Sequence, residues 1–118
     1  MVGLGEDADD ERGDGAGMEI RSEGRAVILL GDVDVRSTGR VREAIYERLA
    51  EPGDLVVDLT GVTSVDVTSL RMLAVATRHA ARSGDRLLLR GCGPAVRRLL
   101  HLTHLVRLVD IERTAAVV

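Results

Sequence analysis

The alternation of apolar and polar positions predicts five strands from residue 18 onward. Residues 18–24 alternate apolar with polar side chains, and residues 25–35 contain a continuous apolar run. Because Gly24 lies between them, these two segments predict a strand, a tight turn and a buried strand. Three later segments predict further strands: residues 54–60, which are rich in β-branched side chains, 85–91 and 106–112.

Three segments between these strands repeat apolar side chains at helical spacing. The first follows a capping residue, Ser37 or Thr38, whose hydroxyl can accept a hydrogen bond from a free amide, and it ends at Pro52-Gly53. The second runs from about Thr68 to Arg82, and the third begins at Pro94. The side chains expected to face inward are Val41, Ala44, Ile45 and Leu49, then Leu70, Leu73, Ala74, Thr77 and Ala81, then Val96, Leu99, Leu100 and Leu105.

The predicted element order, β-β-α-β-α-β-α-β, is typical of an α/β fold. Strands that alternate with helices imply parallel neighbours joined by right-handed crossovers, so only the opening hairpin is expected to be antiparallel. A length of 118 residues suits one domain. The pattern therefore predicts a single domain over residues 18–118 with a mixed, mostly parallel sheet.

Residues 1–17 differ in composition from the rest of the chain. They hold six acidic residues, one arginine and five glycines, which gives a net charge of −5 against −3 for the whole chain. Such a segment buries too little apolar surface to offset the entropy of ordering it, so we expect a disordered acidic tail. An acidic docking arm is the alternative.

Composition narrows the class of function. No apolar run is long enough to span a bilayer, and the acidic N-terminus does not resemble a secretory signal, so we expect a cytoplasmic protein with no membrane partner. Net acidity and a single aromatic residue, Tyr46, argue against a nucleic-acid partner. The lone cysteine, Cys92, is expected to be buried. His101 and His104, three apart on the third helix, make only a weak metal site, so we expect no metal and no cofactor.

The segment Asp58–Leu70, with the sequence DLTGVTSVDVTSL, is the candidate site. A strand is predicted to end there, and Asp66, Thr68 and Ser69 follow a short loop at the start of a helix. These three side chains suit capping roles, because the first helical turn has unpaired amides and a partial positive charge. The same features suit a phosphorylated hydroxyl, and the pattern alone leaves both interpretations open.

This segment resembles the D-L-[S/T]-x-V-x-x-[I/V/M]-D-S-[S/T]-G-L pattern of the STAS domain family, specifically the bacterial anti-sigma factor antagonists. The segment Gly31–Asp34 and the stretch GDRLLLRGCGPAVRRLLHLTHLVRLVDI are also similar to that family, so the resemblance covers residues 18–112. It implies a STAS-type fold. It also implies a regulator that is not an enzyme, and that captures an anti-sigma factor of the serine/threonine kinase type when unphosphorylated.

The resemblance further implies residue roles. Thr68 is the expected phosphorylation site with Ser69 as a backup, and phosphorylation releases the partner until a phosphatase reverses it. The expected partner-binding residues are Asp34, Asp66, Thr68, Ser69, Leu70 and Met72, with Met72 taken as an exposed apolar group. Two positions depart from the family pattern: Val67 replaces a serine and Ser69 replaces a glycine.

Two other functions stay open. One is a STAS scaffold or transporter-associated component that binds its partner constitutively. The other is a small enzyme with a serine or threonine nucleophile, although a base within reach would be required.

Overall fold

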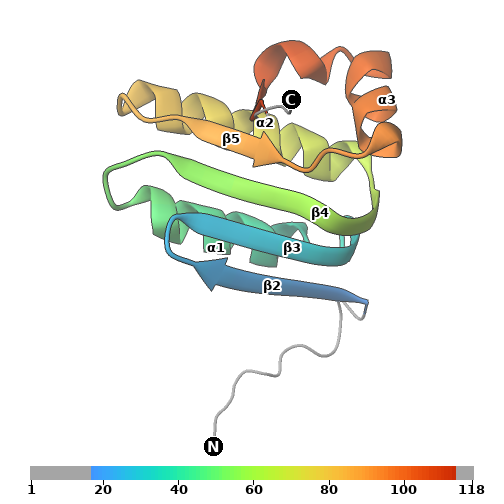
Figure 1. Ribbon diagram of the computed structural model, residues 1–118, viewed down its shortest axis with the longest axis horizontal. Coiled ribbons are helices and arrows are strands. Elements are labelled where there is room, and N and C mark those ends of the chain that lie inside the picture. The colour runs from blue at the N-terminus through green and yellow to red at the C-terminus, as the bar shows by residue number, and fades with distance from the viewer. Residues whose placement is uncertain (1–16, 114–118) are drawn as a thin grey trace, which may run out of the picture.

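A computed structural model describes residues 17–113 (Figure 1). The strands are β2 (Met18–Glu23), β3 (Ala26–Val33), β4 (Leu55–Val65), β5 (Leu87–Arg90) and β6 (Asp110–Ile111). The helices are α1 (Thr38–Leu49), α2 (Val67–Arg82), α3 (Pro94–Leu102) and the short 3₁₀ helix η2 (Leu105–Leu108). The predicted acidic tail lies outside the described residues except for Gly17.

The strands form one sheet in the order β2-β3-β4-β5-β6. β2 pairs antiparallel with β3, and every other neighbouring pair is parallel. The predicted α/β class, element order and single antiparallel hairpin are therefore confirmed, and the 3₁₀ helix is an addition to them. Gly24 makes the hairpin turn with a φ of 58°, a conformation that glycine adopts without steric cost.

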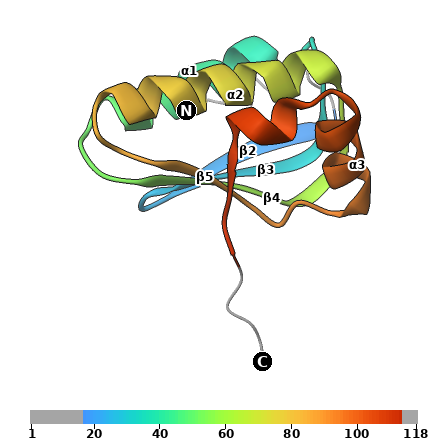
Figure 2. The same ribbon diagram turned by 90° about the horizontal axis from the view of Figure 1, so that it is seen from above.

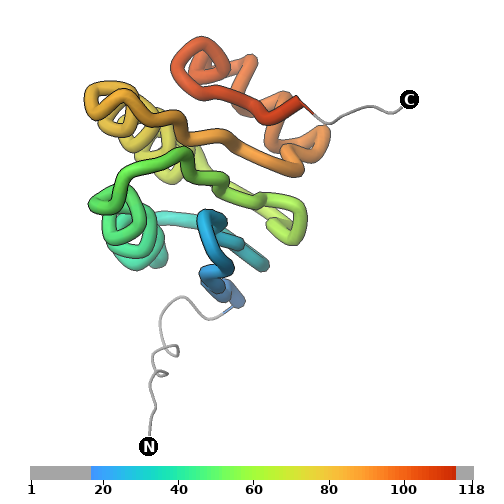
Figure 3. Tube along the Cα trace, turned by 60° about the vertical axis from the view of Figure 1, so that its left-hand side comes forward, coloured from blue at the N-terminus to red at the C-terminus, as the bar shows by residue number. Residues whose placement is uncertain are grey.

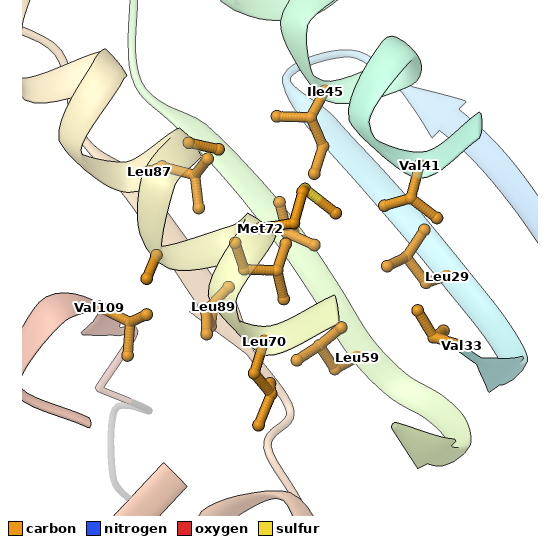
Figure 4. Close-up of a cluster of buried hydrophobic side chains, with 14 of the residues drawn as sticks. Leu29, Val33, Val41, Ile45, Leu59, Leu70, Met72, Leu87, Leu89 and Val109 are labelled. Atoms are coloured by element: carbon orange, nitrogen blue, oxygen red, sulfur yellow. The ribbon is translucent and has the colours of Figure 1, made fainter. Parts of the chain in front are cut away.

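Two helices cover one face of the sheet. α1 and α2 lie side by side on that face, and α3 and η2 close the end of the molecule beside β4, β5 and β6 (Figures 2 and 3). Alternate side chains of the central strands point into the layer between sheet and helices, as period-two strands require. Figure 4 shows this layer, in which aliphatic side chains such as Leu29, Leu59 and Leu89 are buried.

β4 is longer than the sequence pattern predicts. Instead of ending near Thr60, it continues to Val65 and stays paired with β3, through register shifts after Ile28 and after Gly31. There is therefore no loop before α2, and Asp66 alone separates strand from helix. The predicted last strand is shorter than expected, because Leu105–Leu108 forms η2.

The inward faces of the helices are partly as predicted. Thr77 is buried, and its hydroxyl donates to the Leu73 carbonyl at 2.8 Å, one turn earlier. Ala81 was expected inside but is exposed, whereas Ala80 is buried. Ser37 is the N-cap residue of α1, yet its side chain accepts no hydrogen bond from the first turn, so the predicted side-chain cap is wrong.

Candidate partner-binding site

Asp66 holds the start of α2 in place. It is the N-cap residue, with extended backbone angles, and one carboxylate oxygen accepts a hydrogen bond from the Ser69 amide at 2.9 Å. The other oxygen accepts from the Val35 amide at 3.1 Å, in the segment that joins β3 to α1. One carboxylate thus satisfies a free helix amide and also fixes a neighbouring loop.

Thr68 is the second residue of α2, and its side chain is exposed. Within residues 17–113 its hydroxyl makes no hydrogen bond to protein. Since the first amides of a helix carry a partial positive charge, an anion attached to this hydroxyl would be placed favourably. The position is accessible to another protein.

Ser69, the next residue, points away from the exposed side of the helix start. It is fully buried, and its hydroxyl is 3.2 Å from the Thr38 hydroxyl of α1. Thr38 donates its only hydroxyl proton to the Asp34 carbonyl at 3.0 Å, so Ser69 is the donor in the pair. The expectation that Ser69 serves as a backup acceptor is therefore wrong for this conformation, because a buried, bonded hydroxyl cannot meet a kinase.

The segment from Asp34 to Ser37, which joins β3 to α1, lies beside Asp66 and forms the second part of the site. The Asp34 carboxylate binds the Arg36 side chain at 2.8 Å and accepts from the Arg36 amide at 2.9 Å. These hydrogen bonds to Arg36 lower the pKa of Asp34. Between them, the Val35 side chain is 62% exposed, which makes it an apolar contact point near the Asp66 carboxylate that its amide binds.

Two predicted contact residues lie in the core instead. Leu70 has no exposed surface and Met72 is 7% exposed, and both side chains pack in the layer between α2 and the sheet (Figure 4). The expectation that Met72 belongs to an exposed surface is therefore wrong. Because α2 packs against α1 as well as against the sheet, more of its circumference is buried than a single apolar stripe would cover.

Asp32 organises the end of β3, although no signal in the sequence pattern marked it as a site residue. Its carboxylate accepts hydrogen bonds from the Thr63 hydroxyl at 2.6 Å and the Ser64 hydroxyl at 2.8 Å. These two bonds, the Thr63 bond foremost, lower the pKa of Asp32. They tie β3 to the last part of β4 immediately before Asp66.

We expect Asp32→Asn to weaken the fold at neutral pH and to have no such effect in acid. A carboxylate whose pKa is lower in the folded state contributes stability above its unfolded pKa of about 4, and that contribution is lost as pH falls through the folded value. The urea midpoint of wild type should therefore exceed that of Asp32→Asn at about pH 7, and the difference should shrink at a pH well below about 4. Asp110→Asn is the control for the loss of an exposed carboxylate, and its urea midpoint should equal that of wild type at about pH 7. An equal difference at both pH values would contradict the role given to the charge.

The other chemistry-bearing residues form no second site in residues 17–113. His104 lies beyond the end of α3 in a left-handed conformation, with a φ of 63°, so it does not share a helix with His101 as predicted. Cys92 is a buried free thiol whose pKa is raised by burial. Within these residues no three His, Cys, Asp or Glu side chains are placed to hold a metal ion. No helix in the same range has the length and apolarity needed to cross a membrane.

The sequence matches a known family. A family profile described as "Mlab, STAS domain" matches residues 17–110. A STAS-domain containing protein from Pseudomonas aeruginosa is 33% identical over 85 residues, which is 71% of this chain and 83% of that protein. The chain therefore belongs to the STAS domain family.

Solved structures with the same fold include anti-sigma factor antagonists. One from Mycobacterium paratuberculosis has a TM-score of 0.66 and 24% identity, and the match covers 83% of this chain and 86% of that one. The antagonist SpoIIAA in its unphosphorylated form has a TM-score of 0.64 and 14% identity, and the match covers 81% of this chain and 88% of that one. Its phosphorylated form, described as a Bacillus cell fate determinant, has a TM-score of 0.60 and 13% identity, and the match covers 81% of this chain and 91% of that one. At these identities the likeness shows a shared fold.

Proposed function

We propose that this protein is an anti-sigma factor antagonist. In its unphosphorylated form it binds an anti-sigma factor of the serine/threonine kinase type, through the surface around Thr68 and the segment Asp34–Arg36. Phosphorylation of Thr68 releases that partner, and a phosphatase restores binding. The protein thus regulates transcription indirectly, in the cytoplasm, and acts by binding and not by catalysis.

The exposure of Thr68 beside a buried Ser69 is the observation that carries this proposal. The Thr68 hydroxyl at the helix start is open to a kinase, and within residues 17–113 it makes no hydrogen bond that a phosphate would break. The adjacent hydroxyl, that of Ser69, is buried and hydrogen-bonded to the Thr38 hydroxyl. A phosphate at Thr68 would add about 1.5 to 2 negative charges at the positive end of α2, which supports a charge change without loss of the fold.

The same charge would act against a docked partner. The Val35 side chain is exposed next to the site, so a partner that covers it also excludes water from the surroundings of Thr68. A phosphate inside such an interface loses its hydration or faces like charge on the partner. Either effect lowers affinity by tenfold for each 1.4 kcal/mol or so.

The catalytic alternative has little support at this site. A nucleophilic hydroxyl needs a base within hydrogen-bond reach. His79 lies on the same helix as Thr68, but the two are 11 residues apart, which separates them by about 16 Å along the helix axis. Its ring instead contacts Tyr46, with ring centroids 4.9 Å apart.

Constitutive binding is the second candidate function, as a STAS scaffold or a transporter-associated component. The observation in its favour is the pair of departures from the family pattern at Val67 and Ser69. In this protein the Ser69 hydroxyl is used in packing against α1, so the substitution has a structural role that is independent of phosphorylation.

Phosphate mapping distinguishes the two functions. The full chain is used to capture its partner from an extract of the native cells, and the captured protein is then incubated with ATP and fresh chain. We expect a mass increase of one phosphate that fragmentation places on Thr68. Ser69→Ala should be modified to the same extent and Thr68→Val not at all. No phosphate on a chain that still captures a partner would favour constitutive binding, and a phosphate on Ser69 would contradict the assignment.

A further inference from the structure

The exposed face of α2 is a basic ridge that the proposed function uses only at its first residue. Exposed side chains recur at helical spacing from Thr68 through Arg71, Val75, Arg78 and Arg82. The helix contains no aspartate or glutamate. α1, the other helix on this face of the sheet, mixes its exposed arginine with glutamates, so α2 is the one of these two helices with unbalanced positive charge. α3, at the end of the molecule, also has two exposed arginines and no acidic residue.

A groove runs beside this ridge, between α2 and η2. It has a volume of about 370 Å³ and is lined by Val75 and Arg78 from α2 and by Arg107 and Leu108 from η2, among others. Val75 is 61% exposed and Leu108 is 59% exposed, which is high for large apolar side chains. One carboxylate, Asp110, also lines the groove, against two guanidinium groups. An occupant with apolar and acidic side chains would match this surface.

The arginines of the ridge and groove are available to such an occupant. Within residues 17–113, the guanidinium groups of Arg71, Arg78 and Arg107 make no hydrogen bond and no ion pair. Other arginines of the domain are engaged, for example Arg90 with Glu112 at 2.6 Å and Arg25 with the Gly53 carbonyl at 2.9 Å.

The acidic N-terminal segment is joined to the domain near the start of this ridge. The Gly17 carbonyl accepts a hydrogen bond from the Asp32 amide at 3.0 Å, at the end of β3. Gly31, with a φ of 91°, permits this contact, because a Cβ there would collide with the Gly17 carbonyl. Val33, two residues after Gly31, pairs with Val65 just before α2, so Gly17 and the start of β2 lie at the same end of the sheet as the start of α2 (Figure 1).

The segment is long enough to reach the groove. Five strands spaced about 4.8 Å apart put the β6 edge roughly 20 Å from β2, and the helix layer lies about 10 Å above the sheet. Glu6 is 11 residues from Gly17, a span of up to about 36 Å when extended. The acidic run and the apolar Val2 and Leu4 that precede it are therefore within reach of the groove.

We propose that the N-terminal segment, residues 1–16, docks in cis on the basic ridge of α2 and the adjoining α2–η2 groove. Its carboxylates pair with Arg71, Arg78 and Arg107, and its apolar residues contact Val75 and Leu108. Each exposed ion pair is weak, but tethering supplies an effective concentration in the millimolar range. Docked there, the segment competes with a protein that approaches Thr68 along the ridge; this consequence rests on the proposed function, whereas the docking does not.

Trypsin cleavage after Arg12 tests the docking in the full chain. Arg12 is the only basic residue before Arg21, so the product identifies the cut without ambiguity. Substitution of Arg71, Arg78 and Arg107 together by glutamine should speed this cleavage about fivefold at low salt, since three weak ion pairs are lost. About 1 M NaCl should bring wild type to the same rate, because the Debye length falls to about 3 Å.

The matched control removes the same charge elsewhere. Arg42→Gln, Arg86→Gln and Arg98→Gln together alter three exposed arginines outside the groove, and cleavage should stay at the wild-type rate. Equal rates for wild type and the groove variant would overturn the proposal. Equal acceleration by the control variant would also overturn it, because the effect would then be one of net charge.

Backbone amide NMR locates the contact. The full chain is compared with a variant in which Glu6, Asp7, Asp9, Asp10, Glu11 and Asp14 are replaced by their amides. We expect low-salt shift differences at Val75, Arg78 and Leu108 that vanish in about 1 M NaCl. Differences confined to the β2 start, or centred on α3, would overturn the assignment. Neither measurement needs the anti-sigma factor, so failure here leaves the proposed function intact.

Discussion

Thr68→Asp should bind the proposed anti-sigma partner at least about a hundredfold more weakly than wild type, a loss of roughly 2.7 kcal/mol. The hydroxyl is exposed and unbonded within the described residues, so its replacement removes no internal contact. The added carboxylate must lose its hydration or face like charge when a partner covers it. Aspartate carries less charge than phosphate, so the effect of phosphorylation should be larger.

The fold should survive this substitution. A carboxylate in the first turn of a helix is favoured by about 0.3 to 1 kcal/mol, so the Tm of Thr68→Asp should equal or slightly exceed that of wild type. Thr68→Ala should bind within about threefold of wild type, because it adds no charge and removes no bond. Titration calorimetry with the captured partner and thermal melts measure the two effects separately.

Ser83→Asp is the matched control for added charge. Ser83 is exposed and is the C-cap residue of α2, about 22 Å along the helix axis from Thr68. Binding should be unchanged in that variant. If Thr68→Asp and Thr68→Ala both bind like wild type, the switch is wrong and constitutive binding is left as the better account.

Asp66→Ala should lower the free energy of unfolding by about 2 to 3 kcal/mol, the largest stability effect expected from a single polar residue of the site. It removes the helix cap at Ser69 and the bond to the Val35 amide together. Charge-assisted bonds of this kind are stronger than neutral ones. The loop that carries Val35 would also lose its tether to α2, so partner binding should weaken as well.

Asp66→Asn separates the two bonds. An asparagine has one acceptor oxygen, so it can cap Ser69 or hold Val35 but not both. We expect about half the loss seen for Asp66→Ala, measured by urea unfolding followed by circular dichroism. Equal losses of stability for Asp66→Asn and Asp66→Ala would show that the one hydrogen bond kept by asparagine contributes nothing.

Most of the fold could be predicted from sequence because its signals are local. Turn residues such as Gly24 and Pro94 and the period of the apolar residues between them reflect the backbone of each segment, and the alternation of strands and helices then restricts the topology. The extension of β4 to Val65 had no such signal. Residues 61–65 are mostly small or polar, and they are held as a strand by pairing with β3 and by Asp32, which is about thirty residues away in sequence.

The helix faces show where local pattern is insufficient. Ala80 and Ala81 are the same type of residue, and the helical spacing placed Ala81 on the inward face. In the structure Ala80 is buried and Ala81 is exposed. Met72 was expected outside because it lies off the predicted stripe, yet α1 packs against that side of α2. The width of a buried arc depends on how many neighbours a helix contacts, and the helix's own sequence does not encode that number.

The sequence by itself determined the family and the element order, and it pointed to the short stretch Asp66–Ser69 as the proposed site. The family resemblance made Thr68 the expected acceptor and Ser69 its backup, but the local pattern did not show which of the two hydroxyls is exposed, because they are adjacent and both suit the first turn of a helix. Only the tertiary structure decided between them: consecutive helical residues point about 100° apart, and α1 brings Thr38 against Ser69, which leaves Thr68 outside.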